Sequence, residues 1–135
     1  AIFAHDPRVF TFSAHGRHNF PFRKQRSDLD LEFDNQCRGD VYLAALPAAL
    51  EQVFAFAPQF VFYQAGVDAL ATDRLGKLSL TPEDLAARDR LVFAYLQQRQ
   101  LPFVVTLGGG YSDPIEHTVA AAAQTYRLAQ AAIRR

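Results

Sequence analysis

The sequence predicts an α/β fold of three layers, in which helices flank a central parallel sheet. Short runs of β-branched and aromatic residues alternate with longer helical patterns along the chain. Strands separated by helices are normally joined by right-handed crossovers, which leave the strands parallel. Two of the apolar runs end in glycine-rich turns, at the strand ends where such sheets collect functional groups. A chain of 135 residues is long enough for one domain with one core.

The first part of the chain is expected to hold two short strands and a helix. Residues 8–13 are β-branched and aromatic, as in a strand. Residues 29–33 alternate apolar and acidic side chains, which is typical of an edge strand with one wet face. Asp40 is placed to cap a helix that runs to about Phe56. Pro47 is expected to kink or divide that helix.

Two later runs, residues 60–64 and 101–107, are short and almost wholly apolar, which predicts strands buried on both faces. With residues 8–13 they make three parallel strands, fewer than the roughly five or six of a typical sheet. The chain also has no methionine. We therefore expect further strands upstream of Ala1, in a longer protein.

Two helix starts are marked in the second part of the chain. Thr81 is a hydroxyl cap that is followed by a proline and two acids, and this helix should reach about Arg99. Asp113 is followed by a proline and then by Glu116, which repeats the capping pattern. The last helix is expected to run nearly to Arg135, because basic residues suit a carboxyl terminus.

Composition argues against several classes of function. The charges of fourteen basic and fourteen acidic residues cancel, so the chain has no net positive charge that would indicate binding to nucleic acid. The apolar runs fall far short of the roughly 20 residues that cross a bilayer. Cys37 is the only cysteine, which excludes an internal disulfide and a thiolate metal cluster, and which agrees with a reducing cytoplasm. We expect a cytoplasmic protein that binds neither nucleic acid nor a membrane.

An aromatic and basic loop is predicted over residues 15–27. Phe20 and Phe22 alternate with basic residues in a pattern that could contact nucleic acid. Three acidic residues follow at once, however, so a loop that lines a substrate channel is the favoured interpretation. His15 and His18 are three apart, a spacing that could hold a metal on a helix. They lie in a loop without a third ligand, and we expect them to face a cleft instead.

Two polar side chains follow the strand ends. Asp68 follows strand 60–64 after a short turn that contains Gly66, and it could supply a hard oxygen to zinc or another divalent ion. It could equally cap a loop or a helix. Tyr111 follows the glycines at 108–110, and its phenol could donate a hydrogen bond to a developing oxyanion. The glycine run could instead cradle a phosphate, although it lacks the lysine of a P-loop.

Five segments of the chain are each a weak signal alone, but their order and spacing together form a specific pattern. They are RVFTFS at 8–13, HGRHNFPFRK at 15–24, YQAGVD at 63–68, DRLGKLSLT at 73–81 and GGGY at 108–111. Together they resemble the arginase-related deacetylase superfamily of histone deacetylases, acetylpolyamine amidohydrolases and acetoin-utilisation proteins, and most closely class IV histone deacetylases and their bacterial relatives. The resemblance implies that residues 1–135 form the C-terminal half of one deacetylase domain.

The resemblance also implies zinc-dependent hydrolysis of an acyl-amide on a lysine or a polyamine. It assigns Asp68 as the later of two zinc-binding aspartates, and Tyr111 as the catalytic tyrosine that polarises the scissile carbonyl. The residues implied to line or adjoin the substrate tunnel are Phe20, His18, Leu75, Gly109 and Gly110. A structural K⁺ or Na⁺ is implied near Ser13, and the carbonyls of Phe3, Asp6 and Val9 are candidates for a second such site.

The paired catalytic histidines of the resembling family, and its Asp-x-His motif with the other two zinc ligands, would lie upstream of Ala1. The chain is thus expected to supply one zinc ligand of three and no general base. Its partner would be the N-terminal half of the same domain, and alone it would be inactive. A non-catalytic scaffold of the same fold, or an unrelated nucleotide-binding α/β domain, are the alternatives.

Overall fold

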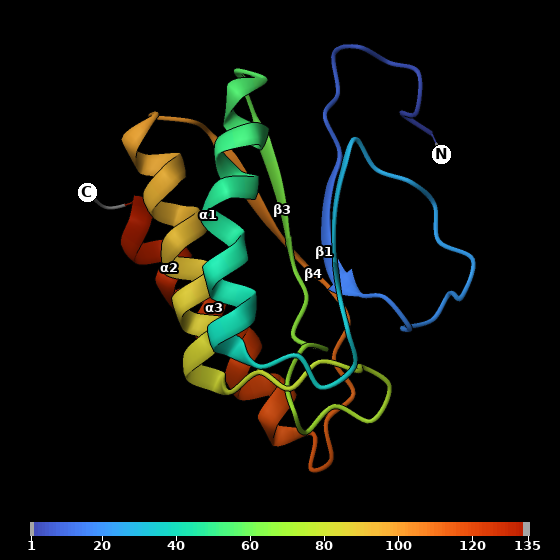
Figure 1. The fold of residues 1–135 in the computed structure, drawn as a ribbon. Helices are drawn as coiled ribbons and strands as arrows, with labels where there is room; N and C mark the ends of the chain where they lie inside the picture. The colour runs from blue at the N-terminus through green and yellow to red at the C-terminus, as the bar shows by residue number, and fades with distance from the viewer. Residues whose placement is uncertain (1, 134–135) are drawn as a thin grey trace.

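The computed structural model describes residues 2–133 and contains four strands and three helices. The predicted α/β class is confirmed (Figure 1). The elements in chain order are β1 Phe12–Gly16, β2 Leu29–Phe33, α1 Gly39–Ala55, β3 Val61–Ala65, α2 Pro82–Gln98, β4 Phe103–Leu107 and α3 Glu116–Ile133.

The strands form two parallel pairs. In one pair Phe12 of β1 lies opposite Leu29 of β2, and in the other Val61 of β3 lies opposite Phe103 of β4. Within residues 2–133 no ladder joins the two pairs to each other. A parallel pair needs a crossover of a dozen or more residues, and residues 17–28 provide one for β1 and β2 without a helix.

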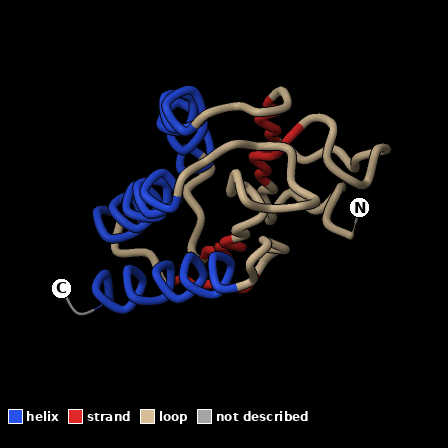
Figure 2. The backbone as a smooth tube through the Cα atoms, turned by 90° about the horizontal axis from the view of Figure 1, so that it is seen from below, coloured by secondary structure: helices blue, strands red, loops and turns tan. Residues whose placement is uncertain are grey.

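The three helices lie together on one side of the strands (Figures 1 and 2). α2 packs between α1 and α3, while α1 also contacts β2 and α3 contacts β4. The core between these elements is apolar, and its most deeply buried hydrophobic side chains are Leu46, Leu70, Leu80 and Leu96. Two of these leucines come from the segment between β3 and α2, so this loop is anchored in the core rather than free at the surface.

The first strand lies further along the chain than predicted. Arg8 folds back on Asp6, to which it donates from its backbone nitrogen at 3.0 Å and from its Nη2 at 2.7 Å. The backbone nitrogen of Thr11 donates to the carboxylate of Asp28 at 2.7 Å rather than to a strand. β1 therefore starts only after these side-chain contacts, and it continues to Gly16, into the predicted loop.

The first helix starts and continues differently from the prediction. Its N-cap residue is Arg38, without a capping side-chain bond, and Asp40 lies inside the first turn beside the Arg38 guanidinium at 3.4 Å. The prediction of Asp40 as the cap is wrong because the helix begins at Gly39, two residues earlier than a cap at Asp40 would place it. Pro47 lies within α1 and does not divide it.

The predicted start of α2 is confirmed, and that of α3 is not. Asp84 donates its backbone nitrogen to Thr81 Oγ1 at 3.1 Å, and Thr81 returns a bond to Asp84 Oδ2 at 2.9 Å. α3 begins at Glu116 rather than next to Asp113, because the preceding residues form a turn that is fixed to Thr118 Oγ1. The predicted end of this helix falls partly on Arg134 and Arg135, outside the described residues.

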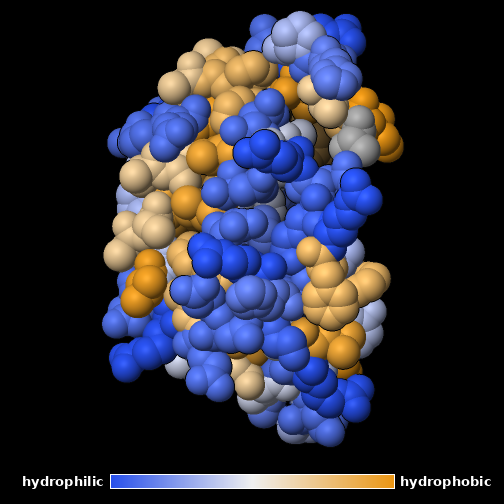
Figure 3. All heavy atoms as spheres, turned by 45° about the vertical axis from the view of Figure 1, so that its right-hand side comes forward, coloured by the Kyte–Doolittle hydropathy of each residue, from blue (hydrophilic) through white to orange (hydrophobic). Residues whose placement is uncertain are grey.

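The paired strands β3 and β4 are not buried on both faces as predicted. Successive side chains of a strand point to opposite faces, and on the outer face Phe62 is 75% exposed and Val104, its partner in the ladder, is 42% exposed. Within residues 2–133 no element covers this face. Hydrophobic atoms also reach the surface at several places on the side shown in Figure 3. No described helix is long and apolar enough to cross a membrane.

Candidate functional site

The loops that follow β3 and β4 meet at the carboxyl ends of these strands. Val67 donates its backbone nitrogen to the Gly109 carbonyl oxygen at 2.8 Å. A Cβ atom on Gly108 would lie 2.5 Å from the Gly66 Cα, so a larger residue would not fit. The glycines of residues 2–133 all avoid positive φ. The loop therefore needs glycine for the close approach of two backbones, and the expected proximity of the two loops is confirmed.

Asp68 stands at this junction, on the β3 side. Its carboxyl group is half-buried, and burial raises its pKa, with a smaller contribution from the negative charge of Asp73. A Cβ atom on Gly109 would lie 3.3 Å from Asp68 Oδ2, so the glycine leaves the room in which this carboxylate sits. No helix starts at Asp68, so the helix-capping alternative loses support.

The half-buried carboxylate of Asp68 fits a metal ligand, because zinc accepts hard oxygen donors and this oxygen pair is not engaged by a neighbouring cation. A catalytic zinc needs three protein ligands. Over residues 2–133, no group of three or more His, Cys, Asp or Glu side chains could hold a metal ion. These residues therefore present one candidate ligand and not a complete metal site.

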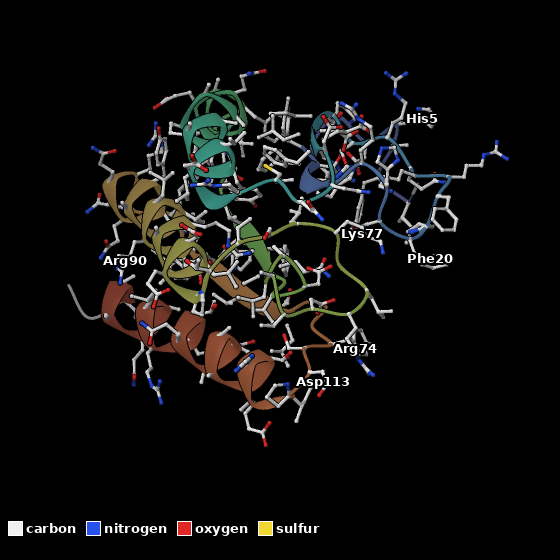
Figure 4. The ribbon with its side chains drawn as sticks, turned by 60° about the horizontal axis from the view of Figure 1, so that its bottom comes forward. His5, Phe20, Arg74, Lys77, Arg90 and Asp113 are labelled. Atoms are coloured by element: carbon white, nitrogen blue, oxygen red, sulfur yellow. The ribbon has the colours of Figure 1, made fainter. Side chains whose placement is uncertain are left out.

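Tyr111 lies beside this junction, on the β4 side, and is 55% exposed. Its backbone is held from both directions by the loop after Asp68. The Tyr111 nitrogen donates to Asp73 Oδ2 at 2.5 Å, and its carbonyl oxygen accepts from the Arg74 nitrogen at 3.2 Å. In Figure 4, Arg74 and Asp113 mark these two neighbouring loops. The phosphate-cradle alternative also loses support, because α3 begins only at Glu116, beyond the glycine run.

The candidate tunnel residue Leu75 belongs to the same junction. It is 62% exposed, and its nitrogen donates to Asp73 Oδ1 at 2.9 Å. The next residue, Gly76, packs so closely on the Asp68 carbonyl oxygen that a Cβ atom would not fit. The structure thus brings together Asp68, Leu75 and Tyr111 with the glycine run.

The other two candidate tunnel residues lie apart from this junction. Phe20 is 83% exposed, and its ring contacts that of Phe22 at a centroid distance of 6.1 Å. His18 is exposed on the same loop, which Lys24 closes with a bond from its Nζ to the Asn19 carbonyl oxygen at 2.5 Å. Among the described residues no hydrogen bond or aromatic contact joins this loop to Tyr111.

The candidate residues for monovalent cations lie before and within β1. Ser13 Oγ is 2.8 Å from Nδ1 of His15, which lies in the strand and not in the predicted loop. The carbonyl oxygens of Phe3 and Asp6 each accept one backbone bond at 3.1 Å, from Asp6 and Val9 respectively. The guanidinium of Arg8 lowers the pKa of Asp6 to about 2. Cation binding here stays a prediction.

A buried polar network behind the junction was not predicted. Arg88 on α2 donates from Nη1 to the Gly66 carbonyl oxygen at 2.7 Å and from Nε to Asp89 at 2.9 Å. Asp89 also accepts the hydroxyl of Tyr63 at 2.5 Å and that of Thr125 at 2.6 Å. Burial raises the pKa of Tyr63 well above its usual value. The network connects α2 and, through Thr125, α3 to the turn that leads to Asp68.

Signals for this network and for Asp73 were present in the sequence. Arg88 and Asp89 are adjacent charges in the middle of α2, between the apolar residues Leu85 and Val92. Asp73 begins the segment DRLGKLSLT, one of the five that carry the family resemblance. The three hydrogen bonds that the Asp73 carboxylate accepts from backbone nitrogens cannot be read from local sequence. The same holds for the burial of Arg88 and Asp89.

Comparison with known proteins identifies the family of this chain. Residues 1–127 match the family model of the histone deacetylase domain. An uncharacterized protein of Picosynechococcus sp. is 45% identical over 119 residues, which is 87% of this chain and 40% of that protein. Histone deacetylase 2 of Arabidopsis thaliana is 33% identical over 119 residues, 85% of this chain and 31% of its own length.

A solved structure shares the fold. The acetylpolyamine aminohydrolase of Burkholderia pseudomallei superposes with a TM-score of 0.79 and 21% identity, over 94% of this chain and 39% of that chain. The chain thus spans at most about two fifths of the length of these relatives. Because the family model matches residues 1–127, the chain belongs to the histone deacetylase domain family.

Proposed function

We propose that this chain forms one side of the active site of a zinc-dependent deacetylase, which hydrolyses an acyl-amide of the acetyl-lysine or acetylpolyamine type. The observation that carries the proposal is the junction of the two strand-end loops. There a half-buried carboxylate, Asp68, and an exposed phenol, Tyr111, lie on loops whose backbones are bonded to each other.

The chemistry assigned to this chain is binding and electrostatic stabilisation. Asp68 would be one ligand of a zinc ion, which when bound supplies Lewis-acid polarisation of a carbonyl and a water of lowered pKa. Tyr111 would donate its hydroxyl proton in a hydrogen bond to the carbonyl oxygen as negative charge develops there. The general base would come from the rest of the domain. Gly109 and Gly110 would leave space for the acyl group, and Leu75, Phe20 and His18 would adjoin its tunnel.

The partner of this chain in the proposal is the N-terminal half of the same domain. It would supply the other two zinc ligands and cover the outer face of β3 and β4, on which Phe62 and Val104 are exposed. The same half would join the two strand pairs, which lack a common ladder within the described residues. A structural K⁺ or Na⁺ near Ser13 belongs to the proposal. So does a cytoplasmic location of the protein, with which the single cysteine, Cys37, is compatible.

The test is hydrolysis by the complete protein, followed with acetyl-lysine peptides and acetylated polyamines. We expect turnover that a chelator abolishes and that added zinc restores, because the chemistry depends on the metal. Binding of zinc without turnover of either substrate class would instead favour the non-catalytic scaffold. Turnover that persists after complete removal of the metal would contradict the proposal.

A further inference from the structure

We infer that Asp73 is a positioning residue that sets the geometry of Tyr111 for hydrolysis, an inference that rests on the proposed function. Its carboxylate is shared between two segments of the junction. Oδ2 accepts the backbone nitrogen of Tyr111 at 2.5 Å. Oδ1 accepts the backbone nitrogens of Leu75 at 2.9 Å and Gly76 at 2.7 Å. One side chain thus links the candidate oxyanion donor to the candidate tunnel wall.

The bonds of Asp73 are of the strong kind. Hydrogen bonds to an ionised carboxylate are shorter than neutral ones and roughly twice as strong. Other hydrogen bonds connect the same loops, and within residues 2–133 none of them involves a charged group. The Arg74 nitrogen donates to the Tyr111 carbonyl oxygen at 3.2 Å, and Thr72 Oγ1 donates to Ser112 Oγ at 3.0 Å. The Asp113 nitrogen donates to the Thr72 carbonyl oxygen at 3.3 Å, and the Val67 nitrogen donates to the Gly109 carbonyl oxygen at 2.8 Å. Asp73 therefore contributes the only charge-assisted link between these two loops among the described residues.

The phenol of Tyr111 depends on its backbone for its position. The side chain is 55% exposed, and no described residue makes a hydrogen bond to its hydroxyl group. In catalysis a misplacement of about 1 Å can cost on the order of 100-fold in rate. A shift of the Tyr111 backbone would move the hydroxyl by a similar distance, whereas the turn that leads to Asp68 has a further anchor of its own, the bond from Arg88 to the Gly66 carbonyl oxygen.

The variant that tests this role is Asp73→Asn in the complete protein. An asparagine keeps the shape but has one carbonyl oxygen and one amide group. Whichever way it turns, either Tyr111 or the Leu75–Gly76 pair faces an N–H donor instead of an acceptor. We expect kcat to fall by roughly 10- to 100-fold, with KM and zinc content close to those of the unmodified protein.

A double-mutant cycle separates positioning from a general loss of structure. If Asp73 acts through the Tyr111 hydroxyl, Asp73→Asn should change the residual kcat of Tyr111→Phe by less than about twofold. An activated trifluoroacetyl-lysine substrate keeps that residual turnover measurable. Ser112→Ala is the matched control, because it removes another link between the same loops without touching the carboxylate. We expect its kcat to stay close to that of the unmodified protein.

Several outcomes would overturn the inference. These are a normal kcat for Asp73→Asn, an equal loss for Ser112→Ala, or effects of Asp73→Asn and Tyr111→Phe that multiply. Normal turnover of Tyr111→Phe would instead remove the role that the proposed function gives to the phenol. If Asp73→Asn does not fold, NMR of the Tyr111 amide proton in the unmodified protein tests instead whether this amide is bonded to the Asp73 carboxylate. A downfield, slowly exchanging proton supports the carboxylate bond, and a solvent-exchanged one contradicts it.

Discussion

Gly108 supplies room for another backbone at the end of β4. Its Cα faces Gly66, and a Cβ atom added there would lie 2.5 Å from the Gly66 Cα and 2.7 Å from the Gly66 nitrogen. Backbone atoms cannot move aside as a flexible side chain can. Gly109 differs, because its added Cβ would meet the side chain of Asp68 at 3.3 Å. The two adjacent glycines should therefore respond differently to the same substitution.

We predict that Gly108→Ala destabilises the complete protein by roughly 1–3 kcal/mol or more, because the junction must open to admit the methyl group. Gly109→Ala should leave the free energy of unfolding nearly unchanged but weaken zinc binding, because the Asp68 carboxylate has to shift. Urea unfolding and a zinc titration of both variants provide the test. Equal stability of Gly108→Ala and the unmodified protein would show that the two loops are not in contact.

At the scale of elements, the buried network around Asp89 joins β3, α2 and α3. Asp89 is 1% exposed and is paired with Arg88, which is 6% exposed. Breaking a buried ion pair by removing one partner is more costly than losing a surface pair, because the other charge stays buried. The network also ends on the Gly66 carbonyl, so it couples the packing of both helices to the turn before Asp68.

We predict that Tyr63→Phe destabilises the complete protein by roughly 1–3 kcal/mol, because the buried carboxylate of Asp89 loses a donor. Tyr95→Phe is the matched control. The Tyr95 hydroxyl donates to Glu51 at 2.7 Å in an exposed position, where water can replace the bond, so its loss should cost less than the loss of the Tyr63 hydroxyl. Equal costs for the two variants in urea unfolding would contradict the importance of the network.

Elements whose signals are local could be predicted from the sequence, and those that depend on distant contacts could not. The capping box at Thr81 involves residues three apart, and it formed as expected. The start of α3 was placed wrongly, because Thr72 and Thr118 fix the segment around Asp113 from outside it. The same division holds for the site. Asp68 and Tyr111 follow strands in the sequence, whereas the role of Asp73 needs the folded loops.

At the scale of the whole molecule, the outer face of β3 and β4 is the main open feature of the described residues. Phe62 and Val104 are exposed there, although both belong to strands that are predicted to be buried. Large exposed apolar patches usually mark an interface, and unpaired strand edges promote association. The relatives are more than twice as long as this chain, and the proposal assigns the cover of this face to the rest of the domain.

We predict that the 135-residue chain alone self-associates, and that it forms a one-to-one complex when the preceding part of the domain is produced with it. Light scattering after size-exclusion chromatography measures both states. A stable monomer of the isolated chain, with a single cooperative unfolding transition, would contradict the proposal that another part of the domain covers the outer face of β3 and β4.

The central claim is that Asp68 and Tyr111 serve one zinc-dependent reaction in different ways. The most direct measurement is zinc content together with kcat, on the complete protein and on its Asp68→Ala and Tyr111→Phe variants. We predict that Asp68→Ala loses both zinc and turnover. Tyr111→Phe should keep its zinc and lose about 100- to 1,000-fold in kcat, as when one oxyanion donor is removed. Full turnover of Tyr111→Phe, or unchanged zinc content of Asp68→Ala, would contradict the claim.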